Sequence, residues 1–133
     1  SVDDGPAINA AIASRAYTVK GRGEFNLRTA IDFTPWSTVS DTFDFGHFFD
    51  FQGTRLVQNG NMTKLVNLSP TDGGQLFRHT IKFGRILGNT SIFTLSYAVY
   101  HRHCSGCFID IILLWICNLE CYRNKMFSLR CLL

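Results

Sequence analysis

Short apolar segments that alternate with polar residues run from residue 16 to the end of the chain, and glycine, asparagine or serine separates most of them. Alternation with a period of two is typical of strands, because successive side chains of a strand point to opposite faces. Clusters such as Gly21-Arg22-Gly23 and Asn59-Gly60-Asn61 are typical of turns. The pattern predicts roughly ten short strands, which suits a solenoid, a sandwich or a barrel.

Only the first residues have helical spacing. Their apolar positions share one face of a helix: Ala7, Ile8, Ala11 and Ile12. Asp3 or Asp4 can accept hydrogen bonds from the free amides of a first turn, and Pro6 stands where its missing N–H costs nothing. We therefore expect a short helix within residues 1–15 that covers the exposed end of a β-structure formed by residues 16–133.

Composition limits the classes of protein to consider. A chain of 133 residues, 46% hydrophobic and 17% charged, suits one globular domain. The 13 basic and 10 acidic residues are scattered, so nucleic-acid binding is not expected. The longest apolar run, residues 111–117, is far shorter than the roughly 20 residues that cross a bilayer, so membrane insertion is not expected either. The chain begins at Ser1, without a Met and with no secretory signal, so we interpret it as either processed or a piece cut from something longer.

A comparison of short apolar–polar–apolar runs favours the solenoid among these options. Comparable runs stand at Leu65-Val66-Asn67-Leu68, Ile81-Lys82-Phe83 and Phe108-Ile109-Asp110-Ile111. Their separations are near one coil of a solenoid or a small gap, since a coil repeats every ~20 or more residues. Such a stack leaves unpaired backbone at its first rung, which an N-terminal helix would cover.

A family resemblance is carried by about the first thirty residues. The run Asp3-Asp4-Gly5-Pro6-Ala7-Ile8-Asn9-Ala10-Ala11-Ile12 is followed by Tyr17-Thr18-Val19, Gly21-Arg22-Gly23 and Glu24-Phe25-Asn26-Leu27. This succession resembles the N-terminal start of the pectin-lyase-like right-handed parallel β-helix proteins, which include bacteriophage tailspikes. The resemblance implies an all-β fold, a right-handed parallel β-helix with a short capping helix, of which residues 1–133 would be the N-terminal part of a longer domain.

The same resemblance implies a carbohydrate-active protein that binds, and in its complete form degrades, a polysaccharide as a lyase or a glycoside hydrolase. It also implies a virion-associated or extracellular location reached without classical export, and no cofactor. This chain has no intact polygalacturonase signature, so enzyme activity stays an open question and the chain itself would be mostly scaffold. The alternative is a non-enzymatic structural or adhesion solenoid, which could assemble as a homotrimer.

Aromatic and polar residues near the middle of the chain are candidates for carbohydrate binding. Trp36 stands in a polar loop, where its ring could stack on a sugar, and His47 and Arg55 could donate hydrogen bonds. Hydrolysis would need two carboxylates about 5–10 Å apart. The scattered acids are Asp41, Asp44, Asp50, Asp110 and Glu120, and the sequence assigns no pair among them.

All five cysteines stand in the last thirty residues. Cys104 and Cys107 have the spacing of half a zinc ribbon, and Cys117 with Cys121 could form the other half. A small zinc-binding domain is therefore a third hypothesis. The interpretation that we favour is that the thiols are reduced and pack as small hydrophobes, because the count is odd and the spacing irregular.

Overall fold

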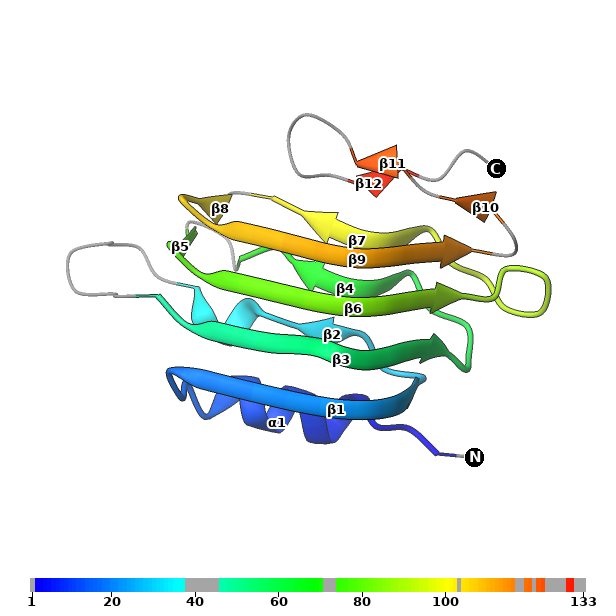
Figure 1. The fold of residues 1–133 in the computed structure, drawn as a ribbon, viewed down its shortest axis with the longest axis horizontal. Coiled ribbons are helices and arrows are strands. Elements are labelled where there is room, and N and C mark those ends of the chain that lie inside the picture. The colour runs from blue at the N-terminus through cyan, green and yellow to red at the C-terminus, as the bar shows by residue number, and fades with distance from the viewer. Residues whose placement is uncertain are drawn as a thin grey trace.

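The fold consists of one α-helix and two parallel sheets (Figure 1). The structure is a computed structural model, and it describes residues 2–37, 46–70, 74–102, 104–116, 119–120, 122–123 and 129–130. The helix, α1, spans Gly5–Ala13, and a single 3-10 turn, η1, spans Thr34–Trp36. No helix in the described part of the chain has the length and apolar character needed to cross a membrane.

The first sheet has the strand order β1-β3-β6-β9-β10. Its members are β1 (Thr18–Leu27), β3 (Phe48–Gln58), β6 (Thr80–Gly88), β9 (Phe108–Ile116) and β10 (Leu119–Glu120). The first four strands are parallel, and β10 pairs with β9 in the antiparallel sense.

The second sheet is parallel and has the order β2-β4-β7. Its strands are β2 (Ile31–Asp32), β4 (Lys64–Leu68) and β7 (Tyr97–His101). Two further pairs are short: β5 (Leu76–Phe77) lies parallel to β8 (Cys104–Ser105), and β11 (Tyr122–Arg123) lies antiparallel to β12 (Leu129–Arg130).

This arrangement corrects the predicted fold class. The expected all-β right-handed parallel β-helix, a solenoid, is wrong for this structure, which is mostly strand (53%) in two parallel sheets with one helix. The expected triplets show where the repeat fails. Ile81-Lys82-Phe83 does pair with Ile109-Asp110-Ile111, but Leu65–Leu68 lies in the second sheet and pairs with β7.

The physical reason for the error is that Gly21, which was expected to make a turn, lies inside a long strand, as do two further glycines. Gly21, Gly53 and Gly84 stand within β1, β3 and β6, close to places where the register of neighbouring strands shifts. A Cβ on Gly84 would collide with the carbonyl oxygens of Gln52 and Thr54. Glycine here permits a close approach between strands and an irregularity in the ladder, which are its usual functions inside a strand.

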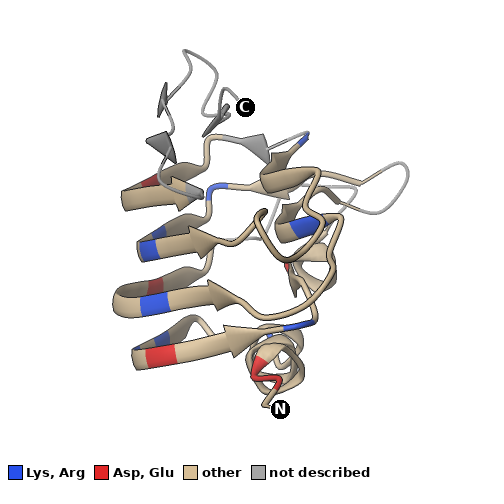
Figure 2. Cartoon of the chain, turned by 90° about the vertical axis from the view of Figure 1, so that its right-hand side faces the viewer, with Lys and Arg blue, Asp and Glu red and all other residues tan. Residues whose placement is uncertain are grey.

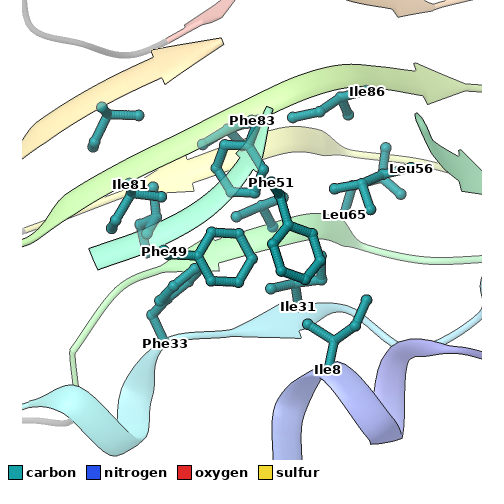
Figure 3. Close-up of a cluster of buried hydrophobic side chains, with 14 of the residues drawn as sticks. Ile8, Ile31, Phe33, Phe49, Phe51, Leu56, Leu65, Ile81, Phe83 and Ile86 are labelled. Atoms are coloured by element: carbon teal, nitrogen blue, oxygen red, sulfur yellow. The ribbon is translucent and has the colours of Figure 1, made fainter. Parts of the chain in front are cut away.

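The core lies between the sheets and the helix. Four side chains in register on the first sheet point into it: Val19, Phe49, Ile81 and Ile109. Phe33, just before η1, packs against Phe49 (Figure 3), with ring centroids 5.0 Å apart, and its centroid is also 5.0 Å from that of Trp36. Ile8 and Ile12 of α1 cover the end of the core beside β1 and β2. Burying one such side chain stabilises a fold by about 1.5–3 kcal/mol.

Two aspartates attach the helix to β1 and the residues that follow it. Asp3 accepts hydrogen bonds from the backbone N–H of Gly5 and also from the backbone N–H groups of Arg28 and Thr29. Asp4 accepts one from the N–H of Asn26 at 2.8 Å, and its own N–H donates to the Asn26 carbonyl. The helix cap predicted from sequence is thus mainly a long-range attachment: Asp4 stands at the N-cap position without a side-chain cap bond.

Candidate functional site

A pocket of about 520 Å³ opens where α1 and the residues after β1 meet the second sheet. Most of its lining residues are of polar types and carry both signs of charge, although their apolar atoms form much of the lining surface: Asn9, Arg28, Thr29, Ala30, Asp32, Met62, Thr63, Lys64 and Asn67. The volume falls within the range of about 300–1,000 Å³ that is common for small-ligand sites. It is therefore large enough for a sugar residue.

Asp32 is the acidic group of this pocket, and a hydrogen-bond network fixes its side chain. Its carboxylate accepts bonds from the Thr34 backbone N–H at 3.0 Å, the Thr34 hydroxyl at 2.8 Å and the Asn67 amide at 3.1 Å. Its own backbone N–H donates to the side-chain oxygen of Asn9, whose amide donates to the Ala30 carbonyl. A network connected in this way is rigid, so the carboxylate keeps one orientation.

An aromatic cluster on β7 adjoins the pocket through Lys64, which lines the pocket and contacts this cluster. Asp32, Asn67 and Tyr100 are in register on three neighbouring strands, about 4.8 Å apart from strand to strand. Lys64 Nζ lies 4.0 Å from the centroid of the Tyr100 ring, a cation–π contact. Tyr97 packs edge-on against Tyr100, with centroids 5.1 Å apart, and remains 50% exposed. We call Asp32, Asn67, Lys64, Tyr97 and Tyr100 the second-sheet face.

His101 follows Tyr100 at the end of β7 and is in register with Leu68. Partial burial lowers the pKa of His101 below its ordinary value of 6.5, because desolvation disfavours the imidazolium. At neutral pH the imidazole beside this face is therefore uncharged. The charges of the second-sheet face come from Lys64 and Asp32.

Two of the three carbohydrate-binding residues predicted from sequence, Trp36 and His47, come together in the buried core, and Arg55 lies apart from them. Trp36 is fully buried: its indole N–H donates to the Ile12 carbonyl at 2.8 Å, and its ring stacks on His47 with centroids 4.7 Å apart. His47 is also buried, and its Nδ1 lies 2.9 Å from the Ala16 carbonyl oxygen. Arg55 lies on the outer side of β3, where its guanidinium is 3.7 Å from the Glu24 carboxylate. Trp36 and His47 therefore pack the core, and Arg55 belongs to a different surface.

The predicted metal ligands fall mostly outside the described residues. Cys117 and Cys121 lie outside them, and only the backbone of Cys104 is described. Cys107 is partly buried, and its thiol donates a hydrogen bond to the Leu76 carbonyl oxygen at 3.4 Å. Within the part that the structure describes, no three His, Cys, Asp or Glu side chains gather as metal ligands. The zinc hypothesis stays a prediction, which elemental analysis of the purified protein tests.

Two of the five acids singled out in the sequence have side chains that the structure describes, Asp50 and Asp110. Asp41 and Asp44 lie outside the described residues, as does the side chain of Glu120. Asp50 and Asp110 lie on the outer side of the first sheet, with Lys82 between them in register. Among the residues that the structure describes, Asp32 is therefore the one carboxylate at the pocket.

Comparison of the chain with protein-family models, with curated proteins and with solved structures finds no match. The resemblance to pectin-lyase-like proteins therefore stays a prediction, and the site rests on its own geometry. Sequence reasoning missed Asp32, Asn67 and Tyr100 because they stand far apart in the chain and only the pairing of β2, β4 and β7 aligns them. The one local signal was the Tyr97-Ala98-Val99-Tyr100 segment, whose tyrosines lie three positions apart.

Proposed function

We propose that this chain is a binding module for a polysaccharide, and that the second-sheet face with its adjoining pocket is the binding site. The observation that carries the proposal is the row Asp32, Asn67 and Tyr100, with Lys64 and the half-exposed Tyr97 beside it. A sugar ring presents an apolar face to aromatic side chains and hydroxyl groups at its edge to polar ones. This face offers both kinds of partner side by side.

The polar groups of the face match the needs of hydroxyl groups. A carboxylate has about four acceptor positions, and Asp32 accepts three hydrogen bonds from described residues. The Lys64 ammonium has three N–H donors, and the same cation contacts the Tyr100 ring. Because Asp32 and Asn67 are already oriented, a ligand binds without having to order them first.

The proposal concerns binding, and cleavage in a longer protein would need acidic groups beyond this face. Asp32 is bound by Thr34 and Asn67, which suits a positioning function. Glycoside hydrolysis by the common mechanism needs a second carboxylate across the scissile bond. The lining of the pocket includes one carboxylate, Asp32.

Affinity electrophoresis through gels that contain soluble polysaccharides, one neutral glucan and one polyuronate among them, tests the proposal. We expect at least one polysaccharide to retard the chain. The Tyr97→Ala variant should lose about tenfold in affinity, equivalent to about 1.4 kcal/mol. Lys64→Met, which keeps the apolar stem and removes the charge, should weaken binding as well.

Tyr17→Ala is the matched control, because Tyr17 is exposed at 66% and contacts His47 away from the second-sheet face. It should bind like the original chain. The proposal fails if no polysaccharide retards the chain, or if Tyr17→Ala and Tyr97→Ala lose affinity equally.

A further inference from the structure

The outer side of the first sheet carries two rows of side chains that alternate from strand to strand. One row alternates in charge, Lys20, Asp50, Lys82 and Asp110, on β1, β3, β6 and β9. The row beside it alternates in size: Thr18, Phe48, Thr80 and Phe108. Their neighbours Val19, Phe49, Ile81 and Ile109 point into the core, so both rows lie on the outer side, and Figure 2 shows charged positions along these strands, away from the second sheet. We call the eight residues of the two rows the alternating face.

Because each row alternates over four strands, the row taken from β1 to β9 is complementary to the same row taken from β9 to β1. A two-fold axis that runs parallel to the strands, between β3 and β6, places β1 opposite β9 of a second copy and β3 opposite β6. Lys20 then faces Asp110 of the other copy, and Asp50 faces Lys82. In the second row the same operation places Thr18 opposite Phe108 and Phe48 opposite Thr80, so that a large side chain always meets a small one.

We propose that the alternating face is an interface between two copies of this chain. A two-fold interface uses the same patch on both copies and must therefore be self-complementary. Both rows meet that requirement, in charge and in volume. Sheets packed face to face keep their strands within about 30° of each other, which agrees with an axis along the strands. Phe48 and Phe108, exposed at 36% and 51%, supply the apolar area of the contact.

The contact ends at the next row of mostly charged side chains, which lies closer to the C-terminal ends of the strands. This row contains Glu24, Arg55, Arg85 and Leu113, and the same axis would set Arg55 against Arg85 of the other copy. The glycines within β1, β3 and β6 stand between this row and the alternating face, so the two belong to separate parts of the sheet. The interface is therefore small and depends on charge, and its stability should fall as salt rises.

Pairing through the first sheet leaves the second-sheet face outside the interface. Figure 2 shows the two sheets on opposite sides of the molecule. A pair of chains would thus present two copies of the proposed polysaccharide site. Since a polysaccharide repeats its ligand along one molecule, two linked sites would bind it more tightly than one.

Charge-exchanged variants of the full chain test the interface in analytical ultracentrifugation at low salt. We expect the original chain to approach twice its monomer mass as its concentration rises. Asp50→Lys alone sets Lys against Lys across the axis, and Lys82→Asp alone sets Asp against Asp, so each variant should remain monomeric. An equimolar mixture of the two should recover the dimer, because both cross-axis pairs become opposite in charge.

The mixture of the two variants distinguishes an interaction between two copies from an interaction within the sheet of one chain. Asp50 and Lys82 are also neighbours within the chain, and mixing two chains cannot repair a defect inside either of them. Should the charge variants unfold, the size row gives an independent pair: Thr80→Phe alone and Phe48→Thr alone weaken the pairing, and their mixture restores the fit between Phe and Thr. A chain that stays monomeric at every concentration, a trimer, or mixtures that fail to associate while the variants remain folded would overturn the proposal.

Discussion

The carboxylate of Asp3 accepts a 2.6 Å hydrogen bond from the hydroxyl of Thr29, across 26 positions of the chain. Asp3 precedes the helix α1, and Thr29 lies in the connection between β1 and β2. The backbone N–H groups of Arg28 and Thr29 donate to the same carboxylate. This contact joins the helix to the end of β1, so it connects the helix with both sheets.

Substituting Thr29 tests how much this contact contributes to stability. Thr29→Val keeps the shape of the side chain and removes the hydroxyl donor, and we expect the free energy of unfolding to fall by about 1–2 kcal/mol. Thr29→Ser keeps the donor and serves as the control, with a smaller loss. Urea unfolding followed by circular dichroism measures both, and equal losses would show that the hydroxyl bond contributes nothing.

The ionisation of Asp3 should make this contribution depend on pH. Burial acts to raise the pKa of Asp3, but hydrogen bonds from the Thr29 hydroxyl and from the backbone of Arg28, Gly5 and Thr29 lower it below the ordinary value of 3.8. A lowered pKa means that the charged form stabilises the fold above 3.8 and that this stabilisation is lost as the pH falls through the folded-state pKa.

The difference in free energy of unfolding between the original chain and Asp3→Asn should therefore be largest near neutral pH and shrink below about pH 4. Urea titrations at pH 7, 5 and 3 measure it. A difference that stays constant over this range would mean that the charge of Asp3 is not what stabilises the contact.

Glycine substitutions test the close approach between strands. A Cβ on Gly84 would press on two backbone carbonyls that cannot move independently of β3, whereas a Cβ on Gly53 would meet only the flexible Arg22 side chain at 3.4 Å. We expect Gly84→Ala to lower the free energy of unfolding by about 3 kcal/mol and Gly53→Ala by less than about 1 kcal/mol. Equal effects in thermal unfolding would contradict the packing described here.

These glycines also show which parts of the fold were predictable. The helix near the N-terminus and several strand positions followed from local periodicity, and Ile8 and Ile12 are buried as the helical spacing indicated. The cluster at Gly21 predicts a turn, but glycine punctuates a chain either at a turn or at a close approach, and the same ambiguity applies to Gly53 and Gly84. Only the backbone of the neighbouring strand distinguishes these two uses, and that strand is remote in sequence.

The site was less predictable than the strands for a similar reason. Trp36 stands among polar residues, and its neighbours in the chain suggested exposure, yet α1 and the two buried histidines, His47 and His79, cover its ring. The second-sheet face depends on register across three strands, which no local pattern contains. Side-chain chemistry can be read from the sequence, but the partners of each side chain are set by pairing between distant segments.

Trp36 gives a final test, because a core residue and a sugar platform respond differently to substitution. Trp36→Phe removes the indole N–H bond to the Ile12 carbonyl and leaves a smaller ring against His47. We expect the free energy of unfolding to fall by about 2–3 kcal/mol. Retardation by polysaccharide should be unchanged under conditions in which the variant is folded, since the ring is fully buried.

Trp115→Phe is the control for this substitution, because Trp115 is 37% exposed on β9. Its effect on the free energy of unfolding should be within about 0.5 kcal/mol. With Trp115 removed, the remaining emission comes from Trp36 alone, and it should be blue-shifted and resistant to iodide quenching. Ready quenching, or a Trp36→Phe chain that is stable but no longer retarded by polysaccharide, would place Trp36 at the binding surface instead of in the core.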